Sequence, residues 1–147
     1  MGDLVPGRGR YATAVFAVDK PGSPLGRLVC DYRKVNLATQ RYAGPSPEIW
    51  STLRRVAGFR FGSLLDFFNG FYHLELTPRA RGALAVVSKG GLYEWVCLPM
   101  GPVNGPQAFQ AAMEKAFCSG GPGSSQRTVF IDDVTVYTGR GADRARM

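Results

Sequence analysis

The sequence has little of the chemistry that forms zinc sites or disulfide frameworks. It contains one histidine, His73, and three scattered cysteines, Cys30, Cys97 and Cys118, with no CxxC pair. This set does not provide the ligands of an ordinary zinc site, and an odd number of cysteines does not build a disulfide framework. We expect three reduced thiols that pack as small apolar side chains.

Long apolar runs are also missing. No stretch of about eighteen or more apolar residues is present, so a membrane-spanning helix is not expected. The N-terminal residues Met-Gly-Asp-Leu-Val-Pro-Gly-Arg lack the apolar core of a secretory signal. Hydrophobic residues make up 45% and charged residues 20% of the chain, as in an ordinary globular domain. We therefore expect an intracellular chain, cytoplasmic or nuclear, that is not secreted and has no membrane partner.

The positive charge is concentrated in the first part of the chain. The net charge is +7, and residues 1–60 carry ten Lys and Arg against four Asp and Glu, whereas residues 61–147 carry eight against seven. A basic part joined to a nearly neutral one favours a polyanionic partner such as nucleic acid. A solvated surface explains the same charge, so basicity alone does not identify the partner.

Strand signals open the chain. Residues 13–18 are β-branched and aromatic and are expected to form a buried strand. A loop over residues 21–26 would connect it to a second strand over residues 27–31. This arrangement is a hairpin with a long loop, and Lys20 and Arg27 lie at its two shoulders.

Two amphipathic helices are predicted. The first begins at Ser46-Pro47-Glu48, which offers a capping hydroxyl, a proline at the first helical position and an acid near the positive end of the helix dipole. Gly58 is placed to end it. The second follows Pro106, where apolar residues recur at helical spacing as far as Phe117.

Further strands are expected between and after these helices. Residues 61–76 have the pattern of two strands separated by an irregular segment at Asn69-Gly70. Residues 83–87 and 92–97 are expected to pair through a Gly-Gly turn, and residues 127–137 to form a hairpin. Strands that precede and follow single helices indicate the α+β class.

Two adjacent carboxylates interrupt the apolar, strand-forming run over residues 129–137. Aspartate is disfavoured in strands, and an unpaired carboxylate removed from water is unfavourable, so Asp132 and Asp133 require a compensating partner. A divalent cation would be such a partner. A solvated two-residue hairpin turn explains the pair as well, and both readings can hold together because a tight turn lets both carboxylates face one cavity.

A third carboxylate, Asp66, ends the separate apolar run Ser63-Leu64-Leu65. One carboxylate from this strand and two from the other could hold two Mg²⁺ ions about 3.5–4 Å apart. Phosphoryl transfer requires such a pair of ions. Asp66 is also a suitable N-cap for a helix, and that alternative stays open.

Phe130-Ile131-Asp132-Asp133 is the last of several motifs that follow one another in order and in register along the chain. These motifs resemble those of reverse transcriptases, and most closely those of gypsy-type LTR retrotransposons. Phe130-Ile131-Asp132-Asp133 is similar to the family's aromatic-x-Asp-Asp box, with Phe where Tyr is usual. Leu65-Asp66 followed by Asn69-Gly70-Phe71 resembles the first catalytic segment, Leu-Asp-Leu-x-x-Gly-Tyr. The remaining matches are Cys30-Asp31-Tyr32-Arg33-Lys34-Val35-Asn36, Gly91-Leu92-Tyr93-Glu94-Trp95, Leu98-Pro99-Met100-Gly101 and Asn104-Gly105-Pro106-Gln107-Ala108-Phe109-Gln110.

The resemblance implies the fingers and palm of a right-hand polymerase, with an antiparallel palm sheet packed on helices. The fingers would comprise residues 1–41 and 74–104, the palm residues 42–73 and 105–138, and a tail residues 139–147. The primer grip, thumb, connection and RNase H segments of the family are expected to be absent from this chain.

The same resemblance implies an RNA-directed DNA polymerase that adds deoxynucleotides to a primer 3′ end on an RNA or DNA template. Two Mg²⁺ ions, or Mn²⁺ in their place, would be bound by Asp66, Asp132 and Asp133, which would be both metal ligands and catalytic residues. The alternatives are an inactive retroelement remnant and a nucleic-acid-binding module without catalysis. The oligomeric state is left open.

Other residues match the family's contacts to nucleotide and template. Lys20 and Arg27 match the residues that hold the triphosphate of a deoxynucleoside triphosphate, although solvated loop charge also explains them. Phe71, with Tyr72 as a competitor, matches the ring beneath the sugar that excludes a 2′-hydroxyl, and Met100 matches a position beside the sugar and base. Template contacts, for which solvation at a strand end is the alternative, are matched by Asp31, Arg33 and Asn36.

Overall fold

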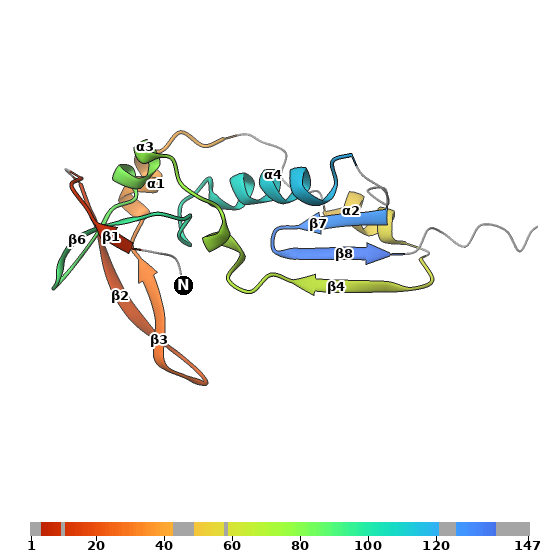
Figure 1. The fold of residues 1–147 in the computed structure, drawn as a ribbon, viewed down its shortest axis with the longest axis horizontal. Helices are drawn as coiled ribbons and strands as arrows, with labels where there is room; N and C mark the ends of the chain where they lie inside the picture. The colour runs from red at the N-terminus through yellow and green to blue at the C-terminus, as the bar shows by residue number, and fades with distance from the viewer. Residues whose placement is uncertain (1–3, 10, 43–48, 58, 121–125, 138–147) are drawn as a thin grey trace, which may run out of the picture. The chain divides into compact units, whose positions relative to one another are not determined.

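The computed structural model describes residues 4–9, 11–42, 49–57, 59–120 and 126–137 (Figure 1). The chain divides into two compact units: unit 1 comprises Met1–Tyr42 and Phe71–Gly105, and unit 2 comprises Ala43–Gly70 and Pro106–Met147. The resemblance described above predicts that the chain passes between fingers and palm after residues 41, 73 and 104. Among the described residues, no helix has both the length and the apolar character to cross a bilayer.

Unit 1 is built on a five-stranded sheet in the order β1-β6-β5-β2-β3. β2 pairs with β5 in parallel, and the other neighbours pair antiparallel. The strands are β1 Leu4–Pro6, β2 Thr13–Lys20, β3 Ser23–Cys30, β5 Val86–Ser88 and β6 Gly91–Trp95. The β5–β6 hairpin predicted from the Gly-Gly turn is thus confirmed, in a shorter form.

β2 and β3 continue beyond the rest of the sheet as a two-stranded arm. β2 pairs with β5 only at Thr13 and Ala14, whereas its pairing with β3 extends to Lys20. Phe16 and Val18 lie in this arm, beyond the rest of the sheet, and their side chains remain 48% and 39% exposed. The strand over residues 13–18 is confirmed, but its expected burial is wrong for this reason.

The loop expected over residues 21–26 is also wrong. β3 begins at Ser23, so the hairpin turns on Pro21 and Gly22 alone, and Gly22 has a φ of +79°. Gly26 lies inside β3 with a φ of +66°, in the part of the arm where the pairing register shifts. A glycine in the left-handed region lets a strand accommodate such an irregularity and continue.

Two short helices of unit 1 were not anticipated. They are α1, Arg33–Ala38, and α3, Pro78–Ala83. α3 carries ordinary start signals, because the Thr77 hydroxyl accepts a hydrogen bond from the backbone N–H of Ala80 at 3.3 Å and a proline follows in the first turn. Each helix has six residues, too few for a periodic apolar pattern to identify it.

The core of unit 1 is centred on two aromatic residues. Tyr32 is 2% exposed, and its hydroxyl donates to the backbone oxygen of Leu84 at 2.8 Å. Trp95 is 3% exposed and stacks on Tyr72, with 5.6 Å between ring centroids. The other buried hydrophobic residues described in this unit are Leu76, Leu84, Ala85, Val86 and Leu98.

Unit 2 is a three-stranded antiparallel sheet in the order β4-β8-β7, accompanied by two helices. Its elements are α2 Ile49–Val56, β4 Gly62–Asp66, α4 Gly105–Phe117, β7 Arg127–Phe130 and β8 Asp133–Tyr137. The hairpin expected over residues 127–137 and the helix expected after Pro106 are confirmed. The side chains buried in the described part of this unit are those of Phe109, Gln110, Met113, Thr128, Val129, Val134 and Tyr137.

The predicted first helix corresponds to α2. Its expected start at Ser46-Pro47-Glu48 and its expected end at Gly58 lie outside the described residues. The apolar side of α2 is less buried than its spacing predicts, since Trp50 is 65% and Leu53 is 48% exposed.

The second strand expected within residues 61–76 does not form. After β4 the chain turns at Asn69, which has a φ of +54°, and enters the 3₁₀ helix η1, Gly70–His73. An isolated bridge from Glu75 to Cys97 is all that follows within this range. Gly70 is buried, and a Cβ atom there would lie 2.9 Å from the ring of Phe109, so the backbone packs directly on α4 at this point.

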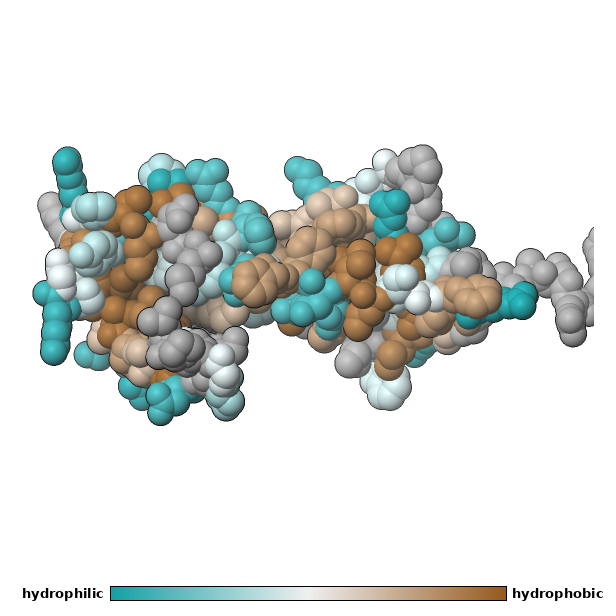
Figure 2. All heavy atoms as spheres, turned by 60° about the horizontal axis from the view of Figure 1, so that its bottom comes forward, coloured by the Kyte–Doolittle hydropathy of each residue, from teal (hydrophilic) through white to brown (hydrophobic). Residues whose placement is uncertain are grey.

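Apolar side chains also reach the surface, as the brown spheres in Figure 2 show. β4 lies at the edge of its sheet, and all five of its residues are exposed. Leu64 is 66% exposed, and Phe61 and Phe68 on either side of β4 are 65% and 83% exposed. Edge strands of soluble domains usually carry charge or are covered, and β4 is neither covered nor strongly charged among the described residues.

Replacement of Gly70 by alanine should destabilise unit 2. The added methyl group would press on a buried ring, and overpacking of this kind costs about 1–3 kcal/mol. Gly105→Ala is the matched control, because its nearest neighbours would lie at 3.8 Å, an ordinary contact distance. Urea denaturation of both variants measures the difference, and equal stability would show that the contact between residues 70 and 109 is not tight.

Candidate active site

β4 and β8 bring two of the predicted carboxylates to the same position of the sheet. Asp66, the last residue of β4, is the partner of Asp133, the first residue of β8. Residues directly opposite in an antiparallel pair point to the same face, with Cβ atoms about 4.5–5.5 Å apart. Asp66 therefore ends a strand rather than capping a helix, and the N-cap alternative is wrong.

Asp132 lies in the two-residue turn that joins β7 to β8. Phe130 pairs with Asp133, which leaves Ile131 and Asp132 as the turn. The backbone oxygen of Asp132 accepts a hydrogen bond from the backbone N–H of Phe67 at 3.2 Å. The end of β4 is thus tied directly to the turn, and the three aspartates occupy one corner of the sheet.

Phe67 is anchored on its other side as well. Its ring packs edge-on against Phe117 at the end of α4, with 5.4 Å between centroids. This contact joins the segment after Asp66 to the helix. Consequently β4, the turn and α4 form one connected support for the three carboxylates.

The donor chemistry fits a hard divalent cation, because the acidic side chains supply only oxygen and Mg²⁺ prefers oxygen ligands. Asp66 is exposed, while Asp132 and Asp133 are half-buried. Within the described part of the chain, however, no three side chains of His, Cys, Asp or Glu are arranged as a finished metal-binding group. The strand pairing therefore places the three aspartates at one corner of the sheet, but their described side chains do not form a complete set of metal ligands.

The turn itself has an unusual conformation. Ile131 has a φ of +56°, and for a β-branched residue this left-handed conformation costs on the order of 1–3 kcal/mol. Its backbone N–H donates to Oε1 of Gln110 at 2.6 Å, and Gln110 is 1% exposed. Gln110 ends one of the matched motifs, but the sequence assigned it no role. The available signal was a polar residue beside Phe109 on the apolar side of a helix.

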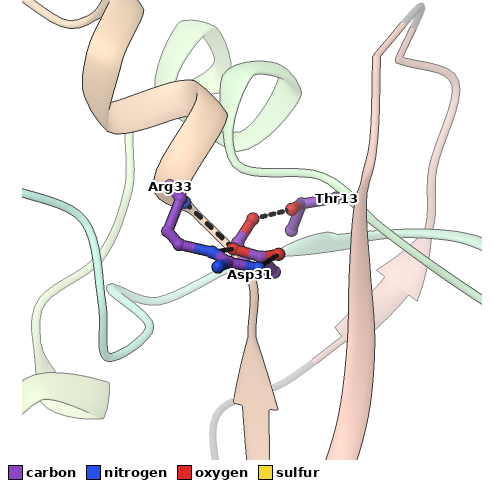
Figure 3. Close-up of polar contacts among 3 residues, drawn as sticks. All are labelled: Thr13, Asp31 and Arg33. Carbon is purple, nitrogen blue, oxygen red and sulfur yellow. Dashed lines mark hydrogen bonds and ion pairs between the residues drawn. The ribbon is translucent and has the colours of Figure 1, made fainter.

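Unit 1 carries the remaining predicted residues. At the start of α1, Asp31 and Arg33 form a bidentate ion pair, in which Nε and Nη2 of Arg33 donate at 2.8 and 2.7 Å (Figure 3). The backbone N–H of Arg33 donates to the same carboxylate at 3.2 Å, and the Thr13 hydroxyl donates to the backbone oxygen of Asp31. The hydrogen bonds from the Arg33 side chain lower the pKa of Asp31 from 3.8 to about 2.

Asn36 has a structural partner on each side of its amide. Nδ2 donates to the backbone oxygen of Gly101 at 3.0 Å, and Oδ1 accepts from the backbone N–H of Val103 at 2.8 Å. Asn104 is also hydrogen-bonded at both ends of its amide. Its Oδ1 accepts from the backbone N–H of Tyr42 at 3.0 Å, and its Nδ2 donates to the backbone oxygen of Gln40 at 2.9 Å. These two asparagines connect the loop after Met100 to α1 and to the segment that follows α1.

The side chains predicted to contact the nucleotide differ in their exposure and in their contacts within the chain. Met100 is 45% exposed, and Phe71 is half-buried beside Gly105, where an added Cβ atom would lie 3.8 Å from its ring. Tyr72, the competitor for this role, stacks on the buried ring of Trp95. The backbones of Lys20 and Arg27 belong to β2 and β3, but their side chains lie outside what the structure describes.

Comparison with known proteins identifies the family. The family described as reverse transcriptase (RNA-dependent DNA polymerase) matches residues 18–146. This chain belongs to the reverse transcriptase family. The resemblance inferred from the motifs is thereby confirmed.

Individual relatives agree. The chain is 29% identical over 150 residues to the Pol polyprotein of transposon gypsy from Drosophila melanogaster, which covers 99% of this chain and 14% of that protein. It is 31% identical over 136 residues to the Pol polyprotein of transposon 412 from the same organism, which covers 89% of this chain and 11% of that protein. The chain thus spans a small part of the curated relatives it matches.

A solved structure extends the likeness to the fold. The foamy viral protease-reverse transcriptase in complex with RNA/DNA hybrid matches with a TM-score of 0.77 and 26% identity, over 92% of this chain and 18% of that one. The expected α+β fold of fingers and palm, with an antiparallel sheet packed on helices, is confirmed by this match.

The pKa of Asp31 should depend on Arg33. Replacement of Arg33 by glutamine removes the charged donor, so the pKa should rise from about 2 toward 3.8. A carboxylate whose pKa is lowered on folding stabilises the folded chain above pH 3.8, and this contribution is lost as the pH falls toward 2.

Titration of the Asp31 carboxyl carbon by NMR measures this pKa. Lys34→Gln is the matched control, since the neighbouring Lys34 contributes least to the lowering. A pKa that stays near its original value in Arg33→Gln would contradict the importance of the ion pair.

Proposed function

We propose that this chain is the fingers-and-palm part of an RNA-directed DNA polymerase that adds deoxynucleotides to a primer 3′ end on an RNA or DNA template. The observation that carries the proposal is the pairing of Asp66 with Asp133 across β4 and β8, with Asp132 in the adjoining turn. Membership of the reverse transcriptase family supports it. The fingers and palm would correspond to units 1 and 2.

The three aspartates would hold two Mg²⁺ ions, or Mn²⁺ in their place. When bound, such a pair of ions activates an attacking hydroxyl and stabilises a leaving oxygen in an in-line displacement. The protein's own contribution is to present Asp66 and Asp133 on one face of the sheet and to hold Asp132 beside them through the hydrogen bond from Phe67.

Nucleic acid and deoxynucleoside triphosphates are the proposed partners. A family relative has been solved with an RNA/DNA hybrid, and the positive charge of residues 1–60 suits a phosphate backbone. Lys20 and Arg27 would hold the triphosphate, and Phe71 and Met100 would lie at the sugar and base. Template contacts would come from Asp31, Arg33 and Asn36.

Two of the proposed template residues already have partners inside the chain. Asp31 is occupied by Arg33, and both ends of the Asn36 amide are hydrogen-bonded. Arg33 remains 88% exposed at its side chain, so it is the member of this group with the most surface to offer a phosphate. We also propose that the protein acts inside the cell.

Metal binding and primer extension should both depend on the aspartates. Asp66→Asn and Asp132→Asn should each weaken Mn²⁺ binding at least about tenfold, a loss seen even when residues that only support metal ligands are changed. Extension of a DNA primer on an RNA template should fall in the same variants. Asp19→Asn, which changes an exposed carboxylate of β2, is the matched control.

Water-proton relaxation measures Mn²⁺ affinity without need of catalysis, and circular dichroism checks folding. Equal Mn²⁺ affinity in the wild-type chain and both site variants would reject the metal site. Such a result would favour a nucleic-acid-binding module in which the aspartates have no role. Metal binding without primer extension would instead describe an inactive remnant that keeps its site.

Phe71 should control the choice of sugar. Phe71→Val removes the ring that would meet a 2′-hydroxyl, so the preference for deoxynucleotides over ribonucleotides should fall about 10- to 200-fold, the range for a change of pocket shape. Tyr72→Phe is the control, since it keeps the ring that stacks on Trp95. Single-nucleotide extension with each substrate gives the ratio, and an unchanged ratio would assign the selection to another residue.

A further inference from the structure

The largest of the fully buried side chains in the described part of the chain is polar. Gln110 of α4 is 1% exposed, and both the nitrogen and the oxygen of its amide form hydrogen bonds. Nε2 donates to the backbone oxygen of Val129 at 3.0 Å and to Oε1 of Glu114 at 2.8 Å. Oε1 accepts from the backbone N–H of Ile131 at 2.6 Å.

The orientation of this amide follows from its partners. The backbone N–H of Ile131 can only donate, and the backbone oxygen of Val129 can only accept. A flipped amide would therefore face both groups with the wrong atom. Gln110 is hydrogen-bonded to the backbone on either side of Phe130, the last residue of β7. These hydrogen bonds attach α4 to the hairpin at the point where β7 ends and the turn begins.

The turn that Gln110 contacts has an unusual backbone conformation. Ile131 has a φ of +56°, a conformation that glycine adopts readily and a β-branched residue rarely does. Its N–H has no partner in the ladder, because Phe130 pairs with Asp133 and the turn residues lie outside the ladder. Without the Gln110 side chain, the N–H of the half-buried Ile131 would lose this hydrogen bond.

We propose that Gln110 is the positioning residue for Asp132, and that its buried amide holds Ile131 in the left-handed conformation. The backbone at residue 131 sets the direction in which the next residue leaves the turn, so a relaxed Ile131 would move Asp132 away from Asp66 and Asp133. The consequence for metal binding rests on the proposed function. The effect on the turn does not.

Glu114 strengthens the grip without touching the turn. It lies one helical turn after Gln110 and accepts the second hydrogen of its amide, which leaves Nε2 with both hydrogens bonded. Glu114 is exposed, so the pair forms a short chain of hydrogen bonds from the helix surface to the hairpin. α4 is the rigid element against which the turn is held.

The test replaces Gln110 by methionine, which keeps the volume and removes the amide. Amide hydrogen exchange of Ile131 should become at least about tenfold faster, as expected when one buried hydrogen bond is lost locally. The Val134 amide in the middle of β8 should stay protected, which separates a local change from unfolding. Mn²⁺ affinity should fall about tenfold, as for other residues that support a ligand.

Two further variants make the test specific. Gln107→Met is the matched control on the same helix, since Oε1 of Gln107 is buried without a hydrogen bond. It should change neither measurement. Gln110→Met combined with Ile131→Gly should recover most of the Mn²⁺ affinity, because glycine adopts the turn conformation without support. A residue that merely filled the core would not be rescued in this way.

The wild-type protein provides an arm that needs no variant to fold. Its Ile131 amide should exchange as slowly as amides of the β7–β8 ladder, and fast exchange would overturn the proposal. Unchanged Ile131 exchange in Gln110→Met, or no recovery in the double variant, would overturn it too. If the wild-type chain bound no Mn²⁺ but protected Ile131, the metal site would fail while the action of Gln110 on the turn would stand.

Discussion

The register between β4 and β8 is the constraint on which the candidate site depends. It places Asp66 opposite Asp133 and Leu65 opposite Val134, so the acids lie on one face of the sheet and the buried side chain of Val134 lies on the other. A slip of one residue would turn every side chain of β4 to the other face and separate the carboxylates. Because Val134 is completely buried, its packing fixes the face of the sheet on which the neighbouring Asp133 lies, and the strand register then places Asp66 beside it.

The turn that carries Asp132 has a different basis. Its conformation is unfavourable for isoleucine, so the support must come from outside the hairpin, and the structure provides it through Gln110 and through the backbone hydrogen bond from Phe67. Local strain that is held by surrounding structure is common where a side chain must be aimed. The apolar packing of β8 and the polar grip of α4 therefore have separate roles at the same corner.

The sequence predicted the elements whose local signals are strong. The β7–β8 hairpin and α4 have long apolar patterns, and both were found where expected. The six-residue helices α1 and α3 are too short for such a pattern. The β2–β3 arm was misjudged because Gly26 in a loop-like sequence permits an irregular strand.

The site shows the same limit. Asp66, Asp132 and Asp133 could be named because carboxylates in apolar runs are conspicuous and because they match a family motif. Their arrangement as neighbours follows from strand register, which no spacing in the sequence determines. Gln110 could not be assigned a role in advance, because its meaning depends on the backbone atoms that it meets from another element.

The central claim is that carboxylates from two strands hold divalent cations at one shared site, and paramagnetic broadening by Mn²⁺ tests it most directly. The backbone amide signals of Asp66 and Asp133 should broaden together as substoichiometric Mn²⁺ is added, with a common midpoint, while that of Asp19 on β2 stays sharp. Broadening of one strand without the other, or of neither, would contradict a shared site.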